Sequence, residues 1–63
     1  MTGLELLLKQ IDEKVQQLEE DLSTGSAKDF SEYKAMCGEI KGLLTARTYV
    51  LETKQMVERA ENE

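Results

Sequence analysis

The side chains that could take part in chemistry are few in this sequence, and they do not form a catalytic or ligand-binding motif. Histidine is absent and Cys37 is the single cysteine, so we expect neither a zinc site nor a nucleophile activated by an imidazole. The acidic residues 19–21 lack the loop pattern of a calcium site, and residues 24–26 are predicted to be a turn rather than a phosphate-binding loop. We therefore expect no catalytic residues, no metal ligands and no cofactor, and we do not expect an enzyme.

Charge and composition restrict the classes of partner. The 63 residues include 13 acidic and 8 basic side chains, for a net charge of −5, which disfavours direct binding to nucleic-acid phosphates or to an anionic membrane surface. The sequence predicts no membrane-spanning segment and no signal peptide, and a reducing environment fits the lone cysteine. We expect protein partners, without direct nucleic-acid or membrane contact.

The first predicted helix spans about residues 2–22. Thr2 and Glu5 have the spacing of a capping box, in which two side chains satisfy the free N–H groups at a helix start. The apolar residues that follow are separated by alternating steps of four and three, which is the spacing of a heptad seam in a coiled coil. The residues of this seam, all predicted to be core, are Leu4, Leu8, Ile11, Val15, Leu18 and Leu22.

A turn over residues 23–29 and a second helix from about 30 to about 60 complete the chain. Gly25 can adopt the left-handed conformation that ends helices, and Asp29 has the spacing to Glu32 that marks a new helix start. A connection this short makes the two helices antiparallel neighbours. The expected fold is therefore all-α, a single antiparallel two-helix hairpin with a longer second helix, assembled with other chains.

The second helix has a broad apolar face in its first half, which is predicted to pack on the seam of the first helix. The core residues predicted on this face are Tyr33, Cys37, Ile40 and Leu44. If Leu22 lies opposite Phe30, then Leu4 lies near Thr48, and the second helix extends past the first as an arm. The arm residues expected to bind another chain are Val50, Met56 and Val57. The alternative is that the arm is a frayed tail.

The opposite side of the second helix is an uncharged strip. At about 100° per residue, this side gathers Ala35, Gly38, Gly42, Thr45 and Tyr49. A helix face that meets only water is normally charged, and each glycine inside a helix costs about 1 kcal/mol relative to alanine. We expect the strip to contact a second helix or another subunit closely. The alternative is a tolerated pair of glycines that face solvent.

Residues 29–52 contain a further pattern. It consists of an Asp-Phe-x-Glu-Tyr start, then Cys-Gly-x-Ile-x-Gly-Leu, and then an Ala-Arg pair. This stretch resembles a group of very short helical proteins of tailed bacteriophages, whereas residues 1–22 resemble that group only in general character. The resemblance implies a structural component of the virion that is encoded among head and portal genes.

Together these features predict a non-enzymatic structural or interaction protein. The resemblance implies a small bacteriophage virion component, made in the host cytoplasm, that docks on capsid, portal or neighbouring copies as a homo-oligomer or as part of a larger assembly. Small size agrees with this, because a domain of about 60 residues buries only about 60% of its unfolded surface. Two alternatives are open: a soluble phage regulator, and a scaffolding or chaperone-like factor, each of which would bind its partner by helix packing.

Overall fold

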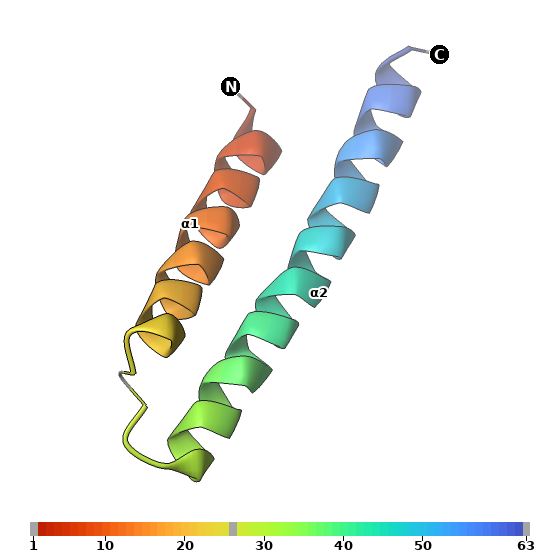
Figure 1. The fold of residues 1–63 in the computed structure, drawn as a ribbon. Helices are drawn as coiled ribbons and strands as arrows, with labels where there is room; N and C mark the ends of the chain where they lie inside the picture. The colour runs from red at the N-terminus through yellow and green to blue at the C-terminus, as the bar shows by residue number, and fades with distance from the viewer. Residues whose placement is uncertain (1, 26, 63) are drawn as a thin grey trace.

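The structure is a computed structural model, which describes residues 2–25 and 27–62. It consists of two helices, α1 (Gly3–Ser23) and α2 (Phe30–Glu61). The helices run antiparallel to each other, and α2 is the longer (Figure 1). The predicted all-α hairpin is therefore confirmed, and each helix begins and ends within one residue of its predicted bounds.

Each helix begins at a cap that the sequence encodes. The Glu5 N–H donates to the Thr2 hydroxyl (3.2 Å) and the Thr2 N–H donates to the Glu5 carboxylate (3.4 Å), so the predicted capping box is present. At the start of α2 the Glu32 N–H donates to the Asp29 carboxylate (2.8 Å). The Glu32 carboxylate reaches past this cap and accepts from the Lys28 N–H (2.7 Å), so this second cap departs from the reciprocal pattern.

The core of the hairpin is small and lies in the middle of α1. Within the described residues, the buried apolar side chains are Ile11, Val15 and Leu18, which are 6–8% exposed. They are the third, fourth and fifth of the six residues in the predicted seam. The remaining members are half-buried: Leu4, Leu8 and Leu22. No described residue of α2 is buried to the same degree.

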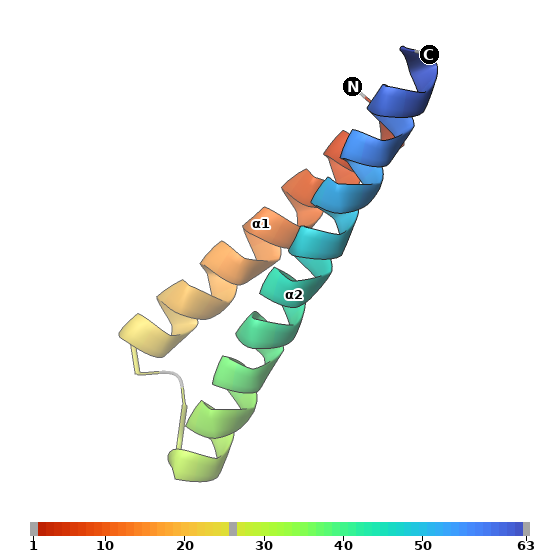
Figure 2. The same cartoon turned by 90° about the vertical axis from the view of Figure 1, so that its right-hand side faces the viewer.

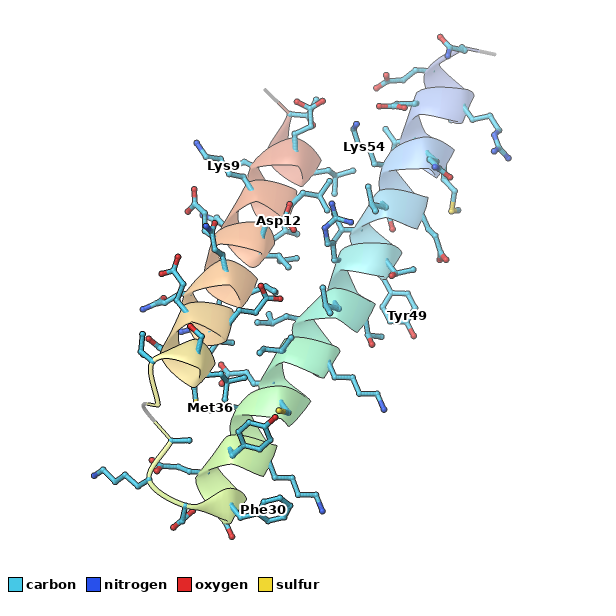
Figure 3. All side chains as sticks on the ribbon, in the orientation of Figure 1. Lys9, Asp12, Phe30, Met36, Tyr49 and Lys54 are labelled. Atoms are coloured by element: carbon cyan, nitrogen blue, oxygen red, sulfur yellow. The ribbon has the colours of Figure 1, made fainter. Side chains whose placement is uncertain are left out.

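Two ion pairs show how the helices are aligned. Arg47 Nε lies 2.7 Å from Asp12 Oδ1, and Lys54 Nζ lies 3.9 Å from Glu5 Oε1. Seven residues separate the two acids on α1 and seven separate the two bases on α2, so both pairs belong to one register. Figure 3 shows Asp12 and Lys54 in the space between the two helices.

The predicted register, with Leu22 opposite Phe30, is wrong. The ion pairs place Leu22 level with Met36 and Cys37, about seven residues further along α2, which is about 10 Å at 1.5 Å per residue. After Gly25, whose φ of 76° is the expected left-handed conformation, the chain continues past the end of α1 before α2 starts. Figure 2 shows the start of α2 well beyond the end of α1.

The spacing of α2 explains why the observed register is favourable. Read backward, the seam of α2 has the same alternating steps of four and three as the seam of α1. Its members, in the order that faces Leu4 to Leu22, are Lys54, Val50, Arg47, Leu43, Ile40 and Met36; all six are half-buried. Arg47 and Lys54 fit into this seam because their aliphatic stems can lie on apolar surface while their charged ends reach the acids of α1.

Two residues that were predicted to be core are exposed. Tyr33 is 49% exposed and Leu44 is 46% exposed. Leu44 lies in the column beside the seam, and Tyr33 lies on the part of α2 that projects past α1. The other two predicted core residues of α2, Cys37 and Ile40, are half-buried. The error for Tyr33 follows from the register, which was placed one heptad too early. Leu44 was assigned to the core wrongly because it lies in the column beside the seam.

The prediction of a single projecting arm also needs correction. In the observed register α2 extends past α1 at both ends, with residues 30–35 at one end and 57–61 at the other. Val50, which was assigned to a partner, is half-buried and level with Leu8 in the seam. The other residues of the predicted arm are exposed: Met56 and Val57.

A disulfide trap distinguishes the two registers. In a Cys37→Ala background, Leu8→Cys combined with Val50→Cys places two thiols opposite each other, so mild oxidation should close an intrachain disulfide. The matched control combines Leu8→Cys with Leu43→Cys, positions that face each other only in the register one heptad away. Mass spectrometry of the oxidised monomer measures closure. A disulfide in the control, with the 8–50 pair still reduced, would contradict the observed register.

Replacing Ile11 by alanine should remove much of the stability of the hairpin. Deleting a buried aliphatic side chain costs about 2–5 kcal/mol, a large share of the stability of a chain with so small a core. Thermal unfolding followed by circular dichroism should show a much lower midpoint for Ile11→Ala. The neighbouring exposed substitution Gln10→Ala should melt like the parent. If both variants melt alike, Ile11 is not a core residue.

Candidate interaction surfaces

Many of the large apolar side chains lie on the surface of this hairpin. In the described ranges, those at least 41% exposed are Leu6, Leu7, Phe30, Tyr33, Leu44, Tyr49, Met56 and Val57. Single exposed apolar residues are common on proteins, so what matters is whether these gather on one face. On α2 all of them except Val57 gather on two faces.

The first face, the lateral stripe, runs along one flank of the α2 seam. Its exposed residues are Phe30, Tyr33 and Leu44, and the half-buried Cys37 lies among them. At about 100° per residue they fall within about 60° of the helix circumference. Phe30 is 74% exposed, because it lies on the part of α2 that α1 does not reach, and Figure 3 shows its ring directed away from α1. The lateral stripe is therefore an apolar surface that the hairpin leaves uncovered.

Sequence reasoning missed the lateral stripe as a surface, although a signal for it was present. In the predicted register Arg47 would have been level with Glu5, and Lys54 would have lain beyond the start of α1. The observed register gives both bases an acid. The positions of the two bases within the seam therefore favoured the register that leaves Phe30 and Tyr33 exposed.

The second face, the back strip, lies on the side of α2 opposite the seam. It contains the five predicted strip residues and extends further along the helix: Ala35, Gly38, Gly42, Thr45, Tyr49, Thr53 and Met56. All seven are exposed and none is charged. Tyr49 is 63% and Met56 is 67% exposed, and Figure 3 shows Tyr49 on the side of α2 away from α1. The structure thus leaves the predicted strip uncovered along its length.

The two glycines of the back strip have no explanation within the chain. A Cβ atom at Gly38 or Gly42 would meet nothing within 4 Å, and neither glycine has a positive φ. Alanine would therefore fit at both positions and would favour the helix by about 1 kcal/mol at each. The glycines lower the stability of α2 without relieving a contact or a strained backbone in the hairpin.

The threonines of the back strip are compatible with an apolar contact. The hydroxyl of Thr45 donates to the carbonyl oxygen of Lys41 (3.0 Å), and that of Thr53 donates to the carbonyl oxygen of Tyr49 (2.9 Å). Because each hydroxyl has a partner within the helix, covering it would not leave an unsatisfied polar group. The back strip can therefore be buried without a large polar penalty.

Other kinds of site are not evident in residues 2–25 and 27–62. These residues form no pocket, and they contain no group of three or more acidic, cysteine or histidine side chains that could hold a metal ion. Cys37 is a half-buried free thiol. Neither helix, over its described residues, is long and apolar enough to cross a membrane. No protein-family model, curated protein or solved structure matches the chain, so the two exposed faces carry the functional argument.

Substitutions at the two glycines test whether the back strip binds a partner or faces solvent. Gly38→Ala and Gly42→Ala should each stabilise the isolated chain by about 1 kcal/mol, measured by thermal unfolding, and the reverse control Ala35→Gly should destabilise it. Gly38→Leu and Gly42→Leu should raise helicity as well, but should weaken assembly through overpacking of about 1–3 kcal/mol. Undiminished assembly of the leucine variants would show that the strip faces solvent.

Proposed function

We propose that this chain is a non-enzymatic structural protein that works by docking on other protein chains in a multi-chain assembly. The main support for the proposal is that more large apolar side chains are exposed than buried. Three apolar side chains of the described residues are buried, whereas eight large ones are at least 41% exposed. A chain of this size with so small a core is marginally stable alone, and association is one of the usual remedies. A partner that covered these side chains would supply the missing burial.

The arrangement of the two faces supports an assembly with more than one neighbour. The lateral stripe and the back strip lie on different sides of α2, and Lys34 and Lys41 fall between them on the helix circumference. Two apolar faces divided by charge can hold two partners independently. A subunit of a multi-copy assembly needs such a pair of surfaces, whereas a binder of one target needs only one.

The more specific form of the proposal is a bacteriophage virion component that docks on capsid, portal or neighbouring copies. It is supported by the resemblance of residues 29–52 to short helical phage proteins. These residues include the whole lateral stripe and most of the back strip. The stretch that carries the resemblance is thus the stretch that offers apolar surface to partners. On this proposal the chain is made in the host cytoplasm and is then incorporated into the virion.

Quantitative mass spectrometry of purified particles tests the proposal. The chain should be present at a fixed ratio to head and portal proteins. Its presence in immature particles and absence from mature ones would instead identify a scaffolding factor. Its absence from both, with recovery on a host or phage protein outside the particle, would identify a regulator. Either result would overturn the assignment to the virion.

The Phe30→Ser variant makes the same experiment specific to the lateral stripe. Because Phe30 is mostly exposed, the free energy of unfolding of the isolated variant should lie within about 0.5 kcal/mol of that of the parent. The variant should nevertheless be depleted from particles, because it has lost an apolar side chain that contacts a partner. Lys9→Ser, on the side of α1 away from α2 (Figure 3), is the control and should incorporate normally. Normal incorporation of Phe30→Ser would remove the lateral stripe from the proposal.

A further inference from the structure

We infer that the back strip is a self-association surface, on which a second copy of the chain packs its own α2 antiparallel about a two-fold axis between Thr45 and Ala46. The inference rests on the proposed function, because it names one partner within the assembly. It is drawn from the order of side-chain sizes along the strip, from the open space beside the glycines, and from the charges on one flank.

Side-chain size divides the back strip into two halves. The half before Thr45 is small: Ala35, Gly38 and Gly42. The half after Ala46 is larger: Tyr49, Thr53 and Met56. Positions at equal distances from the midpoint pair a small residue with a larger one, namely Ala35 with Met56, Gly38 with Thr53, and Gly42 with Tyr49. An antiparallel second copy therefore places every large side chain of one strip against a small residue of the other.

A parallel second copy would lack this complementarity. Each residue would then face itself, with Gly42 on Gly42 at one end and Tyr49 on Tyr49 toward the other. The paired tyrosines would hold the two helix axes apart. The paired glycines would then be too far from each other to make contact, which would leave voids at the glycine end. Interfaces, like protein interiors, are close-packed, and voids forfeit dispersion contacts. The sequence of the strip therefore favours the antiparallel arrangement.

The hairpin leaves both halves of the strip available for such a contact. Space beside Gly38 and Gly42 is open to at least 4 Å from a Cβ position, and Tyr49 and Met56 are exposed at the other half. No part of α1 that the structure describes lies on this side of α2 (Figure 3). Two copies can thus approach through α2 while each keeps its own α1 on the outside.

Charge on one flank of the back strip matches the same arrangement. Lys41 and Glu52 lie on the same flank and at similar distances from the midpoint, on opposite sides of it. The two-fold axis brings Lys41 of each copy within two residues of the level of Glu52 of the other copy, so the contact occurs twice. Among the described residues neither side chain has an ion pair within its own chain. Lys34 and Arg59 meet at the outer ends, where both are exposed and can turn into solvent.

The size of the strip sets the expected strength. From Ala35 to Met56 it is about 33 Å long at 1.5 Å per residue, and a contact between one pair of helices is smaller than the interface of a permanent dimer. We expect a dissociation constant in the micromolar range or higher. Such a contact suits copies that other contacts also hold in place, and it requires measurements at high protein concentration.

Charge exchange tests the flank contact in the full chain. Lys41→Glu and Glu52→Lys should each raise the dissociation constant in sedimentation equilibrium about tenfold, because each change makes two contacts repulsive. The double variant restores both contacts and should return to the parent value. Lys9→Glu, outside the strip, has the same charge change as Lys41→Glu and should leave the constant near that of the parent. No recovery in the double variant, or an equal effect of Lys9→Glu, would overturn the inference.

Disulfide exchange tests the direction of the two helices. In a Cys37→Ser background, Ala35→Cys and Met56→Cys chains are mixed and oxidised at high concentration. The antiparallel arrangement predicts the mixed 35–56 disulfide as the main product by mass spectrometry. A parallel arrangement predicts 35–35 and 56–56 products instead, and their dominance would overturn the inference. Circular dichroism of each chain confirms that it is still helical, so that a loss of pairing is not a loss of folding.

Failure of this inference can be told apart from failure of the proposed function. A chain that remains monomeric up to millimolar concentration, yet is present in particles at a fixed ratio, would refute the self-pairing and leave the assembly role intact. A chain that pairs as described but is absent from every particle would support the self-pairing and refute the virion assignment.

Discussion

The pairing of two heptad seams, one on each helix, is the contact on which the rest of this structure depends. α1 has 21 residues and α2 has 32, so α1 can cover only part of one side of its partner. Ile11, Val15 and Leu18 are buried because they lie in the middle of the seam, with neighbours from α2 on both sides. Residues toward the ends of the seam and beside it remain partly exposed. The small core and the large exposed apolar area therefore have the same cause.

Two basic residues within the seam of α2 contribute to alignment as well as to packing. A heptad pattern can slide by seven residues and keep the same spacing, so spacing alone does not fix a register. In the observed register Val50 joins the seam, and Arg47 and Lys54 each meet an acid. In the register seven residues earlier, Leu22 would be level with Asp29 and Phe30, and Lys54 would lack a partner on α1. Exposed ion pairs contribute only about 0.2–1 kcal/mol each, so the preference for one register is the sum of several small terms.

This explains which features could be predicted from the sequence. The helices, the Thr2 cap and the turn at Gly25 depend on residues that are close in the chain, and they were predicted correctly. The register depends on small differences between equivalent alignments, and its error wrongly placed Tyr33 in the core and Val50 on a partner. Leu44 was misplaced for another reason, because it lies in the column beside the seam. The prediction that the back strip is exposed did not depend on the register. A slide of seven residues rotates a helix by only about 20° relative to its partner, so the same side of α2 faces away from α1 in both registers.

In the proposed docking, the two glycines connect the stability of α2 to the binding of a partner. They lie near the middle of the helix, on the side away from α1, where the hairpin gains nothing from them. Each lowers helix stability by about 1 kcal/mol relative to alanine, which is a large amount for a hairpin with three buried side chains among its described residues. The absence of a side chain also lets another helix axis come closer than alanine or a larger residue would allow. A contact that uses this closeness would return the lost stability only when a partner is bound, so the proposed docking on this face would stabilise a helix that is already formed in the single chain.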